Sequence, residues 1–153
     1  MEEARIVQLP AYRVVKLRYR GPPPPAPAFL EHWRRFTNLA ALFKVASQIE
    51  DVQAIGYAPP ELLSNDLLVY DSCFPVADDY ANEGTELEVG SLPGGRFVLC
   101  AGPIIDLPDL LQAAKRFAIS RGLAIERGHI ELYRPLPPGT DITPVDVGYR
   151  LHD

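Results

Sequence analysis

The sequence predicts an α+β fold: duplicated βαββ units forming an antiparallel sheet, with helices packed on one side and a central concave pocket. Two repeated patterns indicate this. A β-rich segment runs into a Gly-Pro pair and then an amphipathic segment twice, at Gly21-Pro22 and at Gly102-Pro103, 81 residues apart. A strand-like segment ending in Tyr-x-Pro follows each one, at Tyr57 and at Tyr133, 76 residues apart.

We expect one domain over residues 1–153, made of pseudo-repeats at about 5–77 and 86–151. The polar, acidic stretch 78–84 is the natural linker between them. The seam between two half-sheets is a common place for a ligand to bind.

The first repeat is predicted from β-formers, an amphipathic stripe and proline boundaries. Its elements, in order, are strands at 5–8 and 11–20, a helix at 28–46, and strands at 52–57 and 67–76. A turn at Asn65-Asp66 precedes the last strand. The helix is indicated by apolar side chains that recur at helical spacing: Phe29, Trp33, Phe36, Ala40 and Phe43.

The second repeat follows the same order. We expect strands at 86–92 and 96–101 around the turn Pro93-Gly94-Gly95, a helix at 107–121, and strands at 129–134 and 142–151. Asp106 is a plausible N-cap for the helix, and Gly122 follows its end.

Composition narrows the class of function. The net charge of −5 opposes binding to a phosphate backbone, and no apolar run is long enough to span a membrane. The acidic N-terminus does not resemble a signal peptide, so a cytoplasmic protein is the default expectation. No Cys/His spacing predicts a metal site and no motif predicts a cofactor; Cys73 and Cys100 are expected to be small buried hydrophobes.

The strand at 129–134 carries a carboxylate where an apolar residue is expected. Strand alternation puts Glu131 and Tyr133 on one face and Ile130 and Leu132 on the other. If the helices cover the Ile130 face, Glu131 points into the seam, where a ligand cation over aromatic rings would offset its charge. Alternatively, Glu131 faces water or pairs with an arginine such as Arg134 or Arg127.

Other aromatic residues are candidates for the same cleft, and each could equally belong to the core: Trp33, Tyr57, Tyr70, Phe97 and Tyr149. The three histidines, His32, His129 and His152, show no spacing to a serine or cysteine that predicts a nucleophile.

Taken together, these segments resemble the GyrI-like small-molecule-binding domains, which also occur as effector-binding domains of AraC-type and MerR-type regulators and are related to the SOUL heme-binding fold. The matching features are the two strand-Gly-Pro-helix segments, the strand 68–73, the turn 93–97 and the strand 130–133. The resemblance covers residues 5 to 151 and implies a central hydrophobic pocket for lipophilic, often cationic, compounds. It assigns the buried glutamate to Glu131, its tyrosine partner to Tyr133, and aromatic walls to Trp33 and Tyr70.

The resemblance leaves three functions open. The first is a stand-alone binding protein for lipophilic small molecules, cationic ones included. The second is a hydrolase of strained, cyclopropane-type cytotoxins that would use Glu131 and Tyr133 in the same cleft. The third is a protein-interaction module that inhibits a larger enzyme such as gyrase. This sequence departs from the family pattern after each Gly-Pro pair, where Pro23 and Ile104 stand in place of aromatics. No DNA-binding segment is recognised, so no direct nucleic-acid partner is expected.

Overall fold

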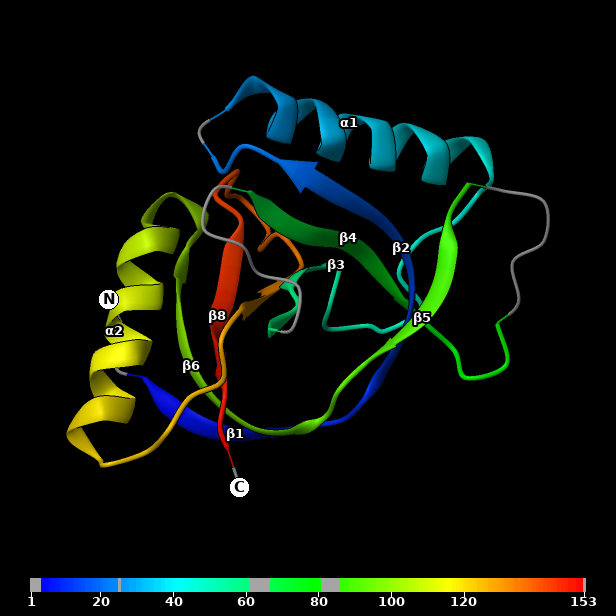
Figure 1. Ribbon diagram of the computed structural model, residues 1–153. Helices are drawn as coiled ribbons and strands as arrows, with labels where there is room; N and C mark the ends of the chain where they lie inside the picture. The colour runs from blue at the N-terminus through cyan, green and yellow to red at the C-terminus, as the bar shows by residue number, and fades with distance from the viewer. Residues whose placement is uncertain (1–3, 25, 61–66, 81–85, 153) are drawn as a thin grey trace.

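The computed structural model describes residues 4–24, 26–60, 67–80 and 86–152. It is α+β, with eight strands in one antiparallel sheet and two helices, as the sequence predicts (Figure 1). The elements are β1 (Arg5–Leu9), β2 (Tyr12–Gly21), α1 (Pro27–Leu42), β3 (Ala54–Ala58), β4 (Leu68–Val76), β5 (Glu88–Leu92), β6 (Gly95–Pro103), the 3-10 turn η2 (Ile104–Asp106), α2 (Leu107–Ser120), β7 (His129–Tyr133) and β8 (Pro144–Arg150). The predicted turn at 65–66 and most of the predicted linker lie outside the described residues.

Helix α1 ends four residues before its predicted end. The Lys44 backbone has a φ of 57°, and the Val45 amide donates to the Ala40 carbonyl while the Lys44 amide donates to that of Ala41. These bonds form a Schellman ending, which normally carries glycine at the left-handed position. The sequence has no glycine here to mark the end of the helix, so the apolar pattern alone placed the predicted end too late. Asp106 lies at the predicted N-cap of α2, but its side chain makes no capping hydrogen bond.

The strand order is β1-β6-β8-β7-β3-β4-β2-β5. From the outside inward, one half reads β2-β4-β3 and the other reads β6-β8-β7, while β1 and β5 each pair with the opposite half. This shared order favours the predicted repeat, which remains a prediction to be tested by superposing the halves. The Tyr-x-Pro segments are not equivalent within it, because Tyr57 is opposite Ile130 and so faces away from Tyr133.

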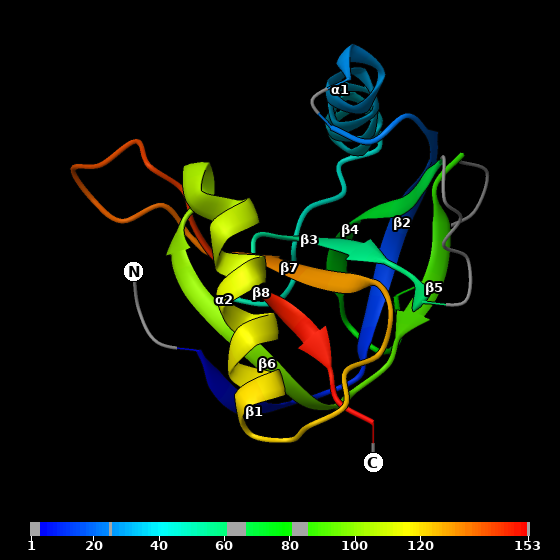
Figure 2. The same ribbon diagram turned by 60° about the vertical axis from the view of Figure 1, so that its left-hand side comes forward.

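The sheet is strongly curved, and both helices lie outside the curve (Figure 2). Inside the curve, apolar side chains from most strands form a core with no helix residue: Leu9, Val14, Val52, Ile55, Cys73, Leu92, Phe97, Leu99, Ile130 and Leu132. Two further cores lie outside it, one under α1 around Phe36 and one under α2 around Leu110. Among the described residues, neither helix is long and apolar enough to cross a membrane.

This arrangement corrects one expectation. Glu131 was expected to point into the concave seam if the helices cover Ile130 and Leu132, but those two side chains face the inside of the curve. Glu131 therefore faces the helix side, at the β3–β7 seam where the two halves meet. The alternative in which Glu131 pairs with Arg134 is not found, because Arg134 binds Asp146 at 2.6 Å.

Gly148 tests this packing. A side chain there would overlap the Val98 carbonyl of β6, so we expect Gly148→Ala to cost about 3 kcal/mol of the free energy of unfolding. Gly139 is a matched control: its φ is +81° but nothing lies within 4 Å of an added Cβ, so Gly139→Ala should cost about 1 kcal/mol. Urea unfolding of both variants measures the difference, and equal losses would contradict the close approach of β6 and β8.

Candidate functional site

The Glu131 carboxylate is buried, with 5% of the residue exposed, and receives three hydrogen bonds. The hydroxyls of Tyr70 and Tyr133 both donate to Oε1, at 2.6 and 2.5 Å. The His129 Nε2 atom lies 2.7 Å from Oε2. His129, Glu131 and Tyr133 are alternate residues of β7 and so share one face. The strand itself thus brings two of the three partners to the carboxylate.

The third partner reaches across a strand. Tyr70 lies on β4, and β3 runs between β4 and β7 with Gly56 directly opposite Glu131. An added Cβ at Gly56 would overlap the Tyr70 hydroxyl and lie 2.5 Å from Glu131 Oε1. The bond between Tyr70 and Glu131 therefore requires glycine at position 56. Tyr70 is 1% exposed, so this bond lies in the interior of the protein.

The surroundings set the protonation state of Glu131. Burial alone would raise its pKa, but the hydrogen bond and charge of His129 and the hydroxyls of Tyr133 and Tyr70 together lower it below its ordinary value. Burial and the nearby carboxylate raise the pKa of both tyrosines, so they stay protonated and keep donating. The site therefore holds an ionised carboxylate at neutral pH.

Helix α1 supplies an aromatic wall beside this cluster. The Trp33 ring meets Tyr70 and Tyr133 edge to face, with ring centroids 6.0 and 5.8 Å apart. Phe29, one helical turn earlier, meets Tyr70 at 4.9 Å. These contacts fix both tyrosine rings from the helix side while their hydroxyls bind Glu131.

Two hollows border the cluster between α1 and the start of α2. One, of about 320 Å³, is lined by Leu30, Trp33, Ala54, Ile104, Tyr133 and Thr143. The other, of about 280 Å³, is lined by Pro23, Pro24, Phe29, Leu68, Tyr70, Leu107, Pro108, Leu111, His129 and Glu131. Both are mainly apolar, and Glu131 is the charged carboxylate among their lining residues. Each is close to the lower limit of volume for small-molecule sites.

Four of the seven predicted site residues come together here: Glu131, Tyr133, Trp33 and Tyr70. The other three lie elsewhere. Tyr57 and Phe97 face the inside of the curved sheet, where Phe97 is 1% exposed. Tyr149 packs beneath α2. Faces of β3, β6 and β8 could not be assigned from alternation alone, because apolar side chains cover both sides of this sheet.

Sequence reasoning missed His129, Phe29 and Gly56. The first has a readable signal, because His129-x-Glu131-x-Tyr133 places three polar side chains on one face of a strand. Phe29 was assigned to the apolar stripe of its helix without a link to the cleft. Gly56 has no local signal, since its role depends on strand pairing. No group of three or more metal-ligating side chains occurs among the described residues.

Comparison with solved structures supports the fold. The chain has a TM-score of 0.70 to SAV2435, solved bound to tetraphenylphosphonium, at 12% identity over 99% of this chain and 94% of that one. The EcmrR C-terminal domain gives 0.69 at 14% identity over 99% and 98%. A protein from Listeria innocua described as a hydrolase gives 0.61 at 10% identity over 98% and 92%.

These similarities extend over nearly the whole chain. They establish that the protein has the GyrI-like fold, as expected from the resemblance of its sequence to the GyrI-like domains. No protein-family model matches the sequence. No curated protein matches it either.

Removing the Glu131 acceptor should destabilise the protein. Glu131→Ala leaves the buried Tyr70 hydroxyl without its partner and opens a cavity, so we expect a loss of about 2–4 kcal/mol. Glu131→Gln keeps the shape and one acceptor oxygen, so it should cost about 1 kcal/mol. Urea unfolding at neutral pH gives both values. A Glu131→Ala variant as stable as wild type would contradict the role of Glu131 as a buried hydrogen-bond acceptor.

The loss of stability in Glu131→Gln should depend on pH. Because folding lowers the pKa of Glu131, its stabilising contribution is present above the unfolded-state pKa of about 4.3 and is lost as pH falls through the folded-state pKa. The difference between wild type and Glu131→Gln should therefore shrink with acidification. A difference that grows instead would mean that burial outweighs the three donors.

Proposed function

We propose that the cleft between α1 and α2 binds lipophilic small molecules, and lipophilic cations in particular, against the Glu131 carboxylate. The observation that carries this proposal is a buried carboxylate that lines one mainly apolar hollow, while its partner Tyr133 lines the other. The lowered pKa of Glu131 keeps this carboxylate ionised at neutral pH. A site of this kind combines apolar contact area with one fixed negative charge, which suits a ligand that is both lipophilic and positively charged.

The charge of Glu131 is not cancelled by a permanent cation. Among the described residues, no lysine or arginine lies within ion-pair distance of it, and its single ion-pair partner is His129. The tyrosine hydroxyls satisfy the hydrogen bonds of Oε1 but carry no opposite charge. A ligand cation would therefore gain Coulomb attraction without breaking an existing lysine or arginine salt bridge.

The aromatic wall supports the same ligand class. Trp33, Phe29, Tyr70 and Tyr133 present rings around the carboxylate, and ring faces attract organic cations. A protein of the same fold, SAV2435, has been solved bound to tetraphenylphosphonium, which is a lipophilic cation. The proposed ligand class for this chain thus agrees with a ligand that the fold is able to hold.

Hydrolysis of a strained electrophile in the same cleft is the second candidate, because a protein of this fold is described as a hydrolase. The geometry favours it less. A carboxylate with a lowered pKa is a weak general base, and both hydroxyls that could activate a substrate already donate to it. A ligand that is recovered unchanged after incubation distinguishes binding from turnover.

Tetraphenylphosphonium should bind the wild-type protein more tightly than Glu131→Gln. The loss of the carboxylate charge should lower affinity by roughly 5- to 150-fold, corresponding to about 1–3 kcal/mol. Neutral triphenylphosphine oxide, with similar rings, should lose less than about threefold. Calorimetric titration measures all four affinities. Equal losses for both compounds would show that Glu131 acts on the shape of the cleft and not on ligand charge.

Trp33 should report the binding. It lines one hollow and is the sole tryptophan in the chain, so its fluorescence has one source. We expect quenching or a spectral shift on titration with tetraphenylphosphonium, with the same midpoint as calorimetry. Unchanged emission at a ligand concentration that saturates the calorimetric signal would place the ligand outside this cleft.

A further inference from the structure

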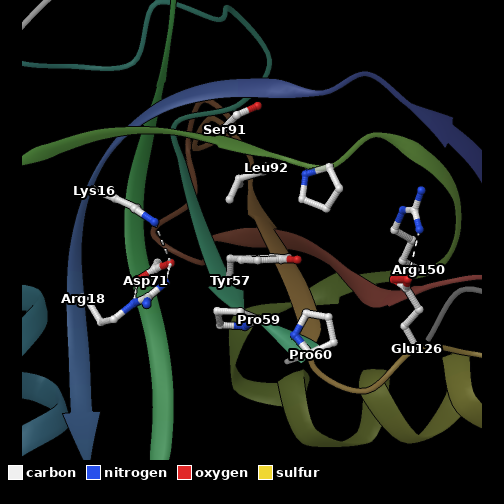
Figure 3. Close-up of a pocket in the computed structure, with 11 residues that line it drawn as sticks. Lys16, Arg18, Tyr57, Pro59, Pro60, Asp71, Ser91, Leu92, Glu126 and Arg150 are labelled. Carbon is white, nitrogen blue, oxygen red and sulfur yellow. Dashed lines mark hydrogen bonds and ion pairs between the residues drawn. The ribbon is translucent and has the colours of Figure 1, made fainter. Parts of the chain in front are cut away.

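A second cavity lies on the opposite face of the sheet from the helix-side cleft. It has a volume of about 290 Å³ and opens inside the curve of the sheet. Figure 3 shows its lining, which comes from β2, β4, the end of β3, the β5–β6 turn and the segments around β7 and β8. The lining residues are Lys16, Arg18, Tyr57, Pro59, Pro60, Asp71, Ser91, Leu92, Pro93, Glu126 and Arg150.

One wall is built around Asp71, which is 1% exposed. Arg18 lies opposite it on β2 and donates to both carboxylate oxygens, from Nε at 2.8 Å and from a terminal nitrogen at 2.9 Å. Lys16, two residues earlier, stands further off, with Nζ 3.4 Å from Oδ2. Arg18 is therefore the main partner of Asp71.

Lys16 is the positive group on this wall that can bind a ligand in the cavity. Its ammonium has three N–H donors, and one long contact to Asp71 is the bond found for it among the described residues. Its side chain is 18% exposed and lines the cavity, so it is partly shielded from bulk water. Gly90 makes room for this position, because an added Cβ there would lie 3.2 Å from Lys16 Cε. A partly desolvated ammonium with unused donors is a site for an anion.

On the opposite wall, a positive and a negative side chain pair with each other. Arg150 binds Glu126 at 3.0 Å and donates from Nε to the Gly94 carbonyl at 2.8 Å. Between the two walls stands the Tyr57 ring, with Pro59 and Pro60 beside it, as Figure 3 shows, and Pro93 also lines the cavity. A flat aromatic surface bordered by prolines suits a planar aromatic ring, which stacks against it.

From this geometry we propose that the cavity binds a small aromatic carboxylate, its acid group on Lys16 and its ring against Tyr57. This ligand is an anion, whereas the ligand proposed for the helix-side cleft is a cation. The two sites lie on different faces of one sheet. The proposal does not depend on the function proposed above, and each can fail without the other.

The probe is 2-naphthoate, with neutral 2-naphthamide as its isostere. In ¹H–¹⁵N spectra of the wild-type protein, 2-naphthoate should shift amide signals of Lys16, Tyr57 and Ser91, while signals of α1 stay in place. Naphthamide should bind at least tenfold more weakly, because the charge-assisted bond to Lys16 is worth about that much. Shifts confined to the α1–α2 cleft, equal binding of both compounds, or no binding at millimolar concentration would overturn the proposal.

Two matched variants locate the charge. Lys16→Met keeps most of the side-chain stem and should weaken 2-naphthoate at least about tenfold. Lys115→Met, at an exposed position of α2, should leave it unchanged. The ¹H–¹⁵N spectra of both variants should match the wild-type spectrum away from the changed residue, and that serves as a check that they are folded. Full 2-naphthoate affinity in Lys16→Met would contradict the assignment.

Discussion

Three hydrogen bonds meet at the Glu131 carboxylate, and the one from Tyr70 joins parts of the chain that are far apart in sequence. Tyr70 belongs to the first half of the chain and Glu131 to the second, and their bond crosses the seam between the half-sheets. It also holds the ring of Tyr70 against Phe29 and Trp33 of α1. One buried acceptor therefore holds the Tyr70 ring in the cleft and supplies the charge inside it.

The same constraint explains why the site is asymmetric. Glu131 and Gly56 face each other on the two central strands, one with a long side chain and the other with none. Two large side chains would collide at this point, and two glycines would leave the tyrosines without an acceptor. The seam thus carries a single charged site because only one of its two central strands fills it with a long side chain.

Much of the fold was readable from the sequence, since helical stripes, Gly-Pro pairs and β-rich runs locate nearly every element. The early end of α1 was not, because its left-handed residue is Lys44 instead of glycine. For the site, alternation correctly placed Glu131 and Tyr133 on one face but could not say which face the helices cover. That choice depends on the curvature of the sheet, which buries Ile130 and Leu132 inside it. Gly56 and Tyr70 matter through strand pairing, which local pattern does not reveal.

Glu131 stays ionised although it is buried, because its three donors outweigh the cost of burial. NMR titration of the ¹³C-labelled side-chain carboxyl carbon of Glu131 tests this most directly, with Glu131→Gln used to assign the signal. We expect a pKa below the ordinary glutamate value of about 4.3. A pKa near or above neutrality would contradict it, because the cleft would then hold a neutral acid and have no fixed charge to offer a cation.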